Sequence, residues 1–309
     1  MPPYSHTYDT DDNARTGASG AGGVGGSLAV VVVDPTSTGW CVAREISRRG
    51  YNLVAVWSDA ITDKMKRQVP SSCSDVFLYA EVNEGPTVHE TARRVREAAP
   101  FDVAACVCGG ETGTALSDAL SEALGLRSTD GTTEGPVSVV GGRWNKKAQQ
   151  ELIKAKGLRS TRQAAGKEFE GDVESFLSKE AYPVIVKPVE STSRDGVKLC
   201  RTFEEAKEHF LFLRGSSSGE VLCQEFLRGK EYAVDNVTKD GIHKTTMLWT
   251  YDKRSANGSE FVYFGCVPVD SETEEAKLIV QYVRSVLDAL GARDGATHTE
   301  VMMTEDGPC

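Results

Sequence analysis

A lysine at the end of an apolar segment is the residue of this sequence best placed to do chemistry. Val184, Ile185 and Val186 form a β-branched run, typical of a strand buried on both faces, and Lys187 follows directly. Pro188 cannot donate to a strand ladder, so the strand should end there. A charged ammonium at this point is costly unless it reaches water or an anion. The pattern therefore indicates an anion-binding lysine or one that extends into solvent.

A loop of small polar residues follows this lysine. Ser191, Thr192, Ser193 and Gly196 leave hydroxyl groups and backbone N–H groups free to turn towards a ligand. A lysine beside such a loop is a common way of holding a polyphosphate. The alternative is an ordinary surface turn beside a solvated lysine, and this stretch alone leaves both interpretations open.

A second cationic position is expected at the start of a helix. Asn145 is a suitable N-cap for a helix that has Lys146 and Lys147 in its first turn and ends at Gly157. Two lysines in a first turn oppose the helix dipole, whereas a helix N-terminus attracts phosphate. We expect either a bound anion at this position or two lysines exposed to water.

The composition excludes several classes of protein. The chain has 309 residues, which suggests about two domains, and its net charge of -10 argues against nucleic-acid binding. No apolar run approaches the ~20 residues of a membrane helix, and the polar N-terminus has no apolar signal core. The eight cysteines form no CxxC pair, which argues against a zinc site or a disulfide scaffold. We expect a reduced, cytoplasmic protein without a nucleic-acid or membrane partner.

The first half of the chain alternates strands and helices, which predicts a parallel sheet with helices on both faces. Ligands on such sheets bind at the carboxyl ends of the strands, where Thr36, Ser37, Thr38 and Glu111 fall. These residues are also ordinary helix caps and turn residues. Strands are expected at 28–33, 53–57, 76–79 and 103–107, and helices from the loop at 34–39 to about 49, at 88–98 and at 114–124.

The glycine-rich stretch before the first strand carries a misleading pattern. Gly20, Gly22 and Gly25 have the spacing of a dinucleotide-binding fingerprint. That fingerprint must follow a strand and open a helix, whereas this one precedes the first strand, so we reject it. Residues 1–27 are instead predicted to be a disordered tail.

The second half is expected to be rich in strands. Asp240 and Gly241 predict a hairpin turn between a strand at 231–237 and one from about 243 to 250. His298 and Glu300 lie on one face of a further strand, but two ligands are too few for a zinc site. The remaining expected elements are helices at 202–210 and 274–290, strands at 221–227, 261–264 and 296–303, and loops at 215–219, 251–260 and 304–307.

Four segments in this order resemble the ATP-grasp superfamily of carboxylate–amine ligases, and most closely its branch of bacterial L-amino acid ligases that form dipeptides. The resemblance covers about 28–309. It implies a mixed α/β protein, α+β in its C-terminal half, with a Rossmann-like domain at 28–142 and an ATP-grasp domain that is truncated at its C-terminal end. The small (lid) subdomain would cover 143–220 and the large subdomain 221–309. The four segments are Arg143–Lys147, Pro183–Pro188 with Ser191–Val197, Gln224–Glu231 and Gly295–Met302.

The resemblance implies a role for each motif. Lys146 and Lys187 would hold the ATP phosphates and serve catalysis. The loop with Ser191, Ser193 and Gly196 would be a mobile cover over the β- and γ-phosphates. ATP and Mg²⁺ would be the cofactors, and the partners would be small carboxylate and amine substrates, with homodimerisation left open.

The remaining implied roles concern the nucleoside and the metal. Gln224, by its side chain, and Leu227, by its backbone, would meet the adenine edge, although family members often carry glutamate where this chain has Gln224. Glu231 would accept from the ribose hydroxyls, and Glu300 would bind Mg²⁺. Considered singly, Glu231 is also a typical solvent-facing strand residue and Leu227 a typical core residue.

The resemblance also implies a strand just beyond Cys309 with a second metal-binding carboxylate and an arginine, which suggests that the sequence is a fragment. The function implied is ATP-dependent joining of a carboxylate to an amine through an acyl phosphate. A non-catalytic nucleotide-binding module is the alternative. A biotin-dependent carboxylase or a D-alanine ligase would share the fold, but the segment 295–302 favours the amino acid ligases.

Overall fold

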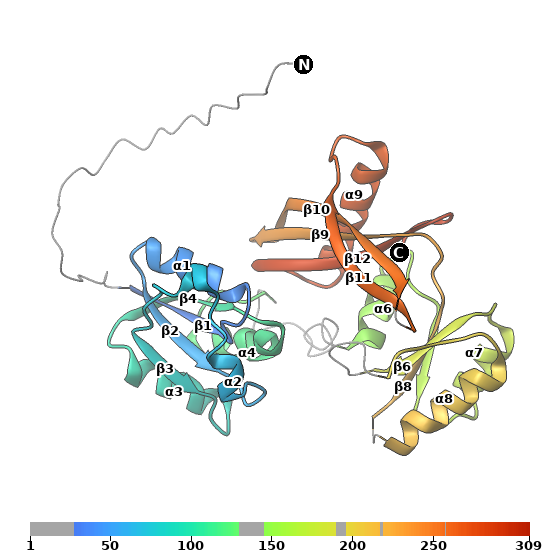
Figure 1. Cartoon of the computed structure of the whole chain (residues 1–309), viewed down its shortest axis with the longest axis horizontal. Helices are drawn as coiled ribbons and strands as arrows, with labels where there is room; N and C mark the ends of the chain where they lie inside the picture. The colour runs from blue at the N-terminus through green and yellow to red at the C-terminus, as the bar shows by residue number, and fades with distance from the viewer. Residues whose placement is uncertain (1–27, 130–144, 190–195, 217–218, 257) are drawn as a thin grey trace.

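The computed structural model describes residues 28–129, 145–189, 196–216, 219–256 and 258–309. Outside this part lie the predicted tail at 1–27, residues 130–144, and Ser191 and Ser193 of the predicted phosphate loop. Three sheets are formed by the described residues, and each is built from one continuous stretch of the chain. Figure 1 shows the first in blue and cyan, the second in yellow-green and the third in orange and red.

The first sheet is parallel with the strand order β3-β2-β1-β4, as the alternation of elements predicts. Helices α3 and α4 pack on one face through Ala92, Val95 and Leu120, and α1 packs on the other through Trp40 and Ala43. The elements are β1 (Leu28–Val33), α1 (Gly39–Arg48), β2 (Asn52–Trp57), α2 (Asp63–Lys66), η1 (Ser71–Cys73), β3 (Ala80–Asn83), α3 (Val88–Ala98), β4 (Asp102–Cys108), η2 (Glu111–Gly113) and α4 (Thr114–Leu124).

The third strand lies later in the chain than the sequence predicts. Residues 76–79 are not a strand, and pairing with β2 begins where Val54 faces Ala80. The apolar residues that suggested a strand at 76–79 are divided: Val76 and Leu78 pack on the core around Trp40, whereas Phe77 is 75% exposed. The apolar residues at 76–79 therefore gave the sequence pattern of a strand, although they belong to a loop that partly covers the core.

A buried carboxylate joins the loops at the carboxyl edge of this sheet. Asp34 is fully buried and has a left-handed φ of 50°. Its Oδ1 accepts from the backbone N–H of Ser58 at 2.8 Å, and its Oδ2 accepts from the hydroxyls of Ser58 at 2.6 Å and Thr112 at 2.7 Å. Asp34 thus ties the loops after β1, β2 and β4 together.

Replacing Asp34 by asparagine should lower the free energy of unfolding by about 1–2 kcal/mol, because one accepting oxygen becomes an amide nitrogen that cannot accept and the other becomes a neutral acceptor. Asparagine tolerates the left-handed backbone, so the loss reports on the hydrogen bonds alone. Urea denaturation measures the change. The exposed neighbour Asp59 is the control, and its asparagine variant should stay within about 0.5 kcal/mol of the parent. Equal losses of stability in the two asparagine variants would contradict the role of Asp34 in joining the three loops.

The second sheet is antiparallel, with the order β5-β8-β6-β7. Helices α7 and α8 cover one of its faces: Leu177 and Phe210 pack on Val184, Val186 and Val221. Helix α8 extends through Ser216, so the loop predicted at 215–219 begins later than expected. The elements are α6 (Lys146–Ala155), β5 (Gln163–Gly166), α7 (Asp172–Lys179), β6 (Val184–Pro188), β7 (Lys198–Cys200), α8 (Phe203–Ser216) and β8 (Val221–Glu225).

The third sheet is also antiparallel, with the order β11-β10-β9-β12-β13 and helix α9 on one face. The predicted hairpin turn is confirmed, because Asp240 and Gly241 have φ values of 53° and 77°, as a type I′ turn requires. Helix α6 packs on α9 through Ile153. The elements are β9 (Lys230–Lys239), β10 (Ile242–Ala256), β11 (Ser259–Pro268), α9 (Glu274–Ala289), β12 (Gly295–Thr304) and β13 (Gly307–Pro308).

The prediction of a polar loop at 251–260 is wrong. Strand β10 continues to Ala256 and pairs with β11 as a long hairpin. Its polar residues remain in the strand because they find charged partners: Arg254 pairs with Asp252 at 2.7 Å, and Lys253 pairs with Glu231. The polar residues at 251–256 therefore belong to a strand with paired charges, although their composition is typical of a loop.

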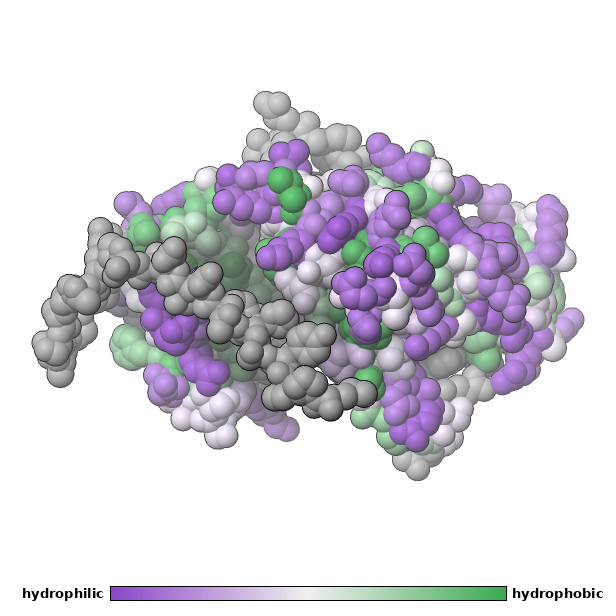
Figure 2. All heavy atoms as spheres, turned by 90° about the horizontal axis from the view of Figure 1, so that it is seen from above, coloured by the Kyte–Doolittle hydropathy of each residue, from purple (hydrophilic) through white to green (hydrophobic). Residues whose placement is uncertain are grey.

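The molecular surface agrees with the composition. In the face drawn in Figure 2, hydrophilic side chains are interspersed with small hydrophobic patches. All eight cysteines are free thiols, as predicted. Among the described residues, none of the helices combines the length and the apolar composition that crossing a bilayer requires.

Candidate functional site

Lys187 lies on the face of the second sheet that α7 and α8 leave uncovered. Its neighbours Val184 and Val186 point into the core beneath those helices, so the alternation of β6 places Ile185 and Lys187 on the opposite face. Strand β8 continues the same face, because Ile185 is opposite Gln224 in the ladder. Two residues predicted to bind the nucleotide, Lys187 and Gln224, therefore share one sheet face.

The pKa of Lys187 is strongly shifted. Burial lowers the pKa of this half-buried lysine from 10.5 to about 8, the ammonium of Lys146 acts in the same direction, and the carboxylate of Glu300 opposes them. Lys146 and Glu300 are therefore close enough to Lys187 to act on its charge. The three residues come from α6, β6 and β12, elements far apart in the sequence. A perturbed lysine beside a second lysine is a typical environment for binding an anion.

The start of α6 is built as the sequence predicts. The Oδ1 atom of Asn145 accepts from the backbone N–H of Ala148 at 3.0 Å and caps the helix. The two lysines of the first turn have separate environments. Lys147 pairs with Glu220 at 3.4 Å, whereas Lys146 lies within electrostatic reach of Lys187. The expected cationic helix start thus divides into one surface ion pair and one lysine whose charge acts on Lys187.

The orientation of Gln224 is fixed by a second glutamine. Gln224 is only 7% exposed, and its Nε2 donates to Oε1 of Gln163 at 2.9 Å. Gln163 in turn donates to the backbone carbonyl of Lys147 at 2.9 Å and to Glu151 at 3.2 Å. Because the amide nitrogen of Gln224 is committed, its amide oxygen is the atom that remains to accept from a ligand. Gln163 is a site residue that sequence reasoning missed.

Glu231 and Glu300 lie on the face of the third sheet that α9 leaves uncovered. Their strands are adjacent, with Glu300 opposite Ala233 and Met302 opposite Glu231. The side chain of Glu300 is 58% exposed, so a ligand can reach it. Sequence reasoning also missed Lys253, which pairs with both carboxylates. Its alternation with Tyr251 along β10 would have been the signal, had the strand been extended past residue 250.

Aromatic and polar side chains surround these carboxylates. Burial, followed by the charges of Glu300 and Glu231, raises the pKa of Tyr251. His298 contacts Asp235 at 2.6 Å and Tyr251 at 2.8 Å, so hydrogen bonds occupy both of its ring nitrogens. In the part of the chain that the structure describes, no cluster of three or more histidine, cysteine or acidic side chains is arranged to hold a metal.

The segment between β8 and β9 joins the second and third sheets. It carries Leu227, which is half-buried, and crosses closely over β12. A Cβ atom on Gly229 would lie 2.0 Å from the carbonyl oxygen of Met303, so only glycine fits there. At the other end of the site, Gly196 has a φ of 78° and packs against Pro188. The remaining residues of the predicted phosphate loop lie outside the described part.

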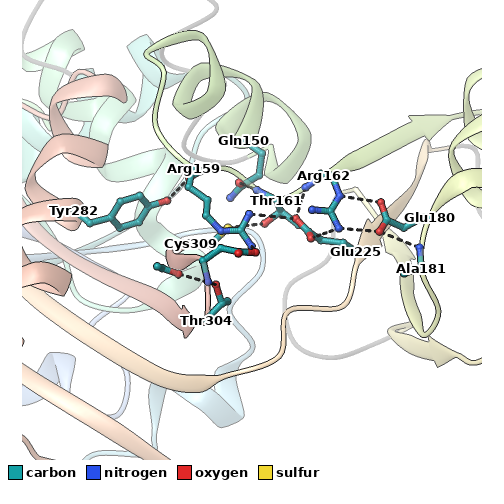
Figure 3. Close-up of polar contacts among 12 residues, drawn as sticks. Gln150, Arg159, Thr161, Arg162, Glu180, Ala181, Glu225, Tyr282, Thr304 and Cys309 are labelled. Atoms are coloured by element: carbon teal, nitrogen blue, oxygen red, sulfur yellow. Dashed lines mark hydrogen bonds and ion pairs between the residues drawn. The ribbon is translucent and has the colours of Figure 1, made fainter. Parts of the chain in front are cut away.

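An ionic network around the buried carboxylate of Glu225 lies beside this crossing segment. Figure 3 shows Arg162 between Glu180 and Glu225. Its guanidinium is 2.8 Å from Glu180 and 2.7 Å from Glu225, and its backbone N–H donates to Glu225 at 2.8 Å. Arg159 approaches Glu225 and Asp306, each at 3.9 Å. The network connects the end of β8 with the turn between β12 and β13, where it borders a pocket of about 620 Å³.

Comparison with known proteins supports one family. Residues 180–309 match the model of the ATP-grasp domain. Dapdiamide A synthase from Enterobacter agglomerans is 33% identical over 218 residues, which cover 68% of this chain and 49% of that protein. The chain therefore spans about half the length of this curated relative.

Solved structures share the fold. An L-amino acid ligase from Bacillus licheniformis matches 91% of this chain and 65% of its own, with a TM-score of 0.67 and 19% identity. An N5-carboxyaminoimidazole synthetase from Staphylococcus aureus, solved with ADP, matches 91% of this chain and 68% of its own, with a TM-score of 0.65 and 13% identity. The domain match at 180–309, supported by the curated relative, shows that this chain contains an ATP-grasp domain, and the solved structures share its fold.

Proposed function

We propose that the protein joins the carboxylate of an amino acid to an amine at the expense of ATP, through an acyl phosphate, with release of ADP and phosphate. The main support is the convergence of Lys146, Lys187 and Glu300 from three separate elements, two cations and one carboxylate. This is the charge pattern that a metal-bound triphosphate needs. The relative that is 33% identical is a dapdiamide synthase, which favours an amino-acid-derived substrate.

In this proposal the two lysines bind and orient the phosphates. Lys146 and Lys187 neutralise charge that develops on the transferred phosphoryl group, which is the main contribution a protein makes to such a transfer. Ser191, Ser193 and Gly196 would cover the β- and γ-phosphates. Gln224 and Leu227 would hold the adenine edge, and Glu231 the ribose hydroxyls.

The residues present fit a magnesium ion. Mg²⁺ is usually held by one or two carboxylates together with substrate phosphates rather than by a complete protein cage. Glu300 offers one exposed carboxylate beside the cations expected to hold the phosphates. When bound, the ion would supply charge neutralisation on the phosphate oxygens.

The reaction proceeds in two steps. The substrate carboxylate attacks the γ-phosphorus, so an O–P bond forms and the bond to ADP breaks. The amine then attacks the acyl carbon, and phosphate leaves with the former carboxylate oxygen. Phosphorylation is needed because a carboxylate oxygen is otherwise a poor leaving group, and binding both partners side by side removes much of the entropic barrier.

Isotope transfer tests this function. Protein expressed from the complete reading frame is assayed for ADP release with a panel of amino acids, and an active acid is then labelled with ¹⁸O in its carboxylate. We expect one labelled oxygen in each released phosphate. Unlabelled phosphate from an active protein would exclude the acyl phosphate, and tight nucleotide binding without ADP release for any pair would favour a non-catalytic nucleotide-binding module.

A further inference from the structure

Lys253 is the residue of the site that neither the sequence motifs nor the proposed reaction accounts for. Its Nζ donates to Oε1 of Glu231 and lies 3.8 Å from Oε1 of Glu300. Its ammonium lies over the ring of Tyr251, with Nζ 4.3 Å from the ring centroid. The side chain is only 19% exposed, whereas that of Glu300 is 58% exposed. Lys253 is therefore held between the two carboxylates, with Glu300 open to solvent.

Electrostatics explains why a cation is needed there. Glu231 and Glu300 lie on the same face of adjacent strands, and two like charges that close repel each other. One ammonium in contact with both removes that repulsion. The contact with Glu231 is the closer of the two, and the contact with Glu300 is a looser ion pair. Glu300 can exchange its partner without breaking the bond between Lys253 and Glu231.

We propose that Lys253 is a built-in counter-cation of Glu300, one that a divalent cation must displace when it binds. This inference rests on the proposed function, because it takes Glu300 as the metal-binding carboxylate. A metal ion alone competes with Lys253 for Glu300 and therefore binds weakly. Nucleotide phosphates add negative charge beside Lys187 and Lys146 and offer Lys253 a new partner, so metal and nucleotide bind together rather than in separate steps.

The binding of Mn²⁺ alone, followed by electron paramagnetic resonance without nucleotide, tests the competition directly. Replacing Lys253 by methionine keeps most of the side-chain volume and removes the charge. We expect the Lys253→Met chain to bind Mn²⁺ about fivefold more tightly, the effect of losing one partly exposed ion pair. A Lys253→Gln chain should show the same gain, and Glu300→Gln introduced into Lys253→Met should abolish it.

Lys244 provides the matched control. It lies on the same strand, β10, is exposed, and pairs in the ladder with Val237 rather than with an acidic residue. Lys244→Met changes the net charge of the protein equally, so a general electrostatic effect would appear in both variants. We expect no change in Mn²⁺ affinity for Lys244→Met, and circular dichroism should show the same folded state for all chains.

Three results would overturn the proposal: unchanged or weaker Mn²⁺ binding in folded Lys253→Met, an equal gain in Lys244→Met, or a gain that survives Glu300→Gln. The failure of the proposed function is distinguishable, because it would appear as absent binding of an ATP analogue to the parent chain. If the analogue binds to the parent chain with an affinity that depends on Lys187, while Lys253→Met leaves the Mn²⁺ affinity unchanged, then only the proposed competition between Lys253 and the metal ion is wrong.

Discussion

Replacing Lys187 by methionine is expected to weaken the binding of a non-hydrolysable ATP analogue about 100-fold while leaving the protein folded. Removing one partner of a largely desolvated charge pair costs about 2–5 kcal/mol of binding, and 100-fold is near the lower end of that range. Calorimetry with the analogue and Mg²⁺ measures the change. Lys147, which pairs with Glu220 at the surface, is the control, and Lys147→Met should change the affinity less than threefold. Unchanged affinity in Lys187→Met would show that this lysine has a structural role only.

The same substitution should stabilise the protein at neutral pH. Burial, with Lys146 next, lowers the pKa of Lys187 from 10.5 to about 8 in the folded state, so the folded protein disfavours the charged form. The penalty is fully present below pH 8, where the lysine is charged in both states. It is relieved as the pH rises from 8 to 10.5, where the unfolded chain binds the extra proton. We expect Lys187→Met to gain about 1–2 kcal/mol at pH 7 after allowance for solvent screening, and the gain to vanish near pH 10.5.

The affinity of the parent chain for the nucleotide should fall with rising pH, over the range in which the stability of the parent chain rises. The phosphates need the charged lysine, so affinity should be constant below pH 8 and fall as the pH rises above it. Lys187→Met should lose this dependence. An affinity that is constant from pH 7 to pH 10 in the parent chain would contradict the assignment of Lys187 to the phosphates.

Removal of the buried carboxylate of Glu225 is expected to destabilise the protein by about 2 kcal/mol. Its side chain is 6% exposed and is the partner of Arg162 at 2.7 Å and of Arg159 at 3.9 Å (Figure 3). Glu225→Ala removes a counter-charge from two guanidinium groups and leaves the backbone N–H of Arg162 without its acceptor. The cost stays below that of a fully buried pair, because the side chain of Arg162 is 56% exposed and keeps Glu180 as a partner. Urea denaturation, with amide exchange in β5 and β8 as a local readout, measures the loss.

Glu220 is the matched control for this prediction, because it lies at the other end of β8 and its side chain is 36% exposed. Its pair with Lys147 is a surface ion pair, so Glu220→Ala should cost less than about 1 kcal/mol. Similar losses in the two variants would indicate that Glu225 behaves as a surface residue. Because Leu227 follows two residues later, the nucleotide affinity of Glu225→Ala also shows whether the network positions the crossing segment.

The elements that the sequence predicts well are those whose local signals agree with their packing. The parallel sheet at 28–108, the cap at Asn145 and the turn at Asp240–Gly241 depend on alternation, capping and turn chemistry within a few residues. The errors arise where tertiary contacts override those signals. Phe77 is apolar but exposed in a loop, and Lys253 is charged but held in a strand by Glu231.

The candidate site divides in the same way. The sequence by itself determined which residues are candidates for the chemistry, because a lysine ending the β-branched strand, the two lysines after Asn145 and a carboxylate on the strand at 296–303 are chemically distinctive without any fold. Only the tertiary structure decided that Lys147 pairs with Glu220 at the surface, that Gln163 orients Gln224, and that Lys253 stands between Glu231 and Glu300. The physical reason is that a charge acts over distance, and distances between residues from different elements are set by how the sheets and α6 pack, which no local pattern encodes.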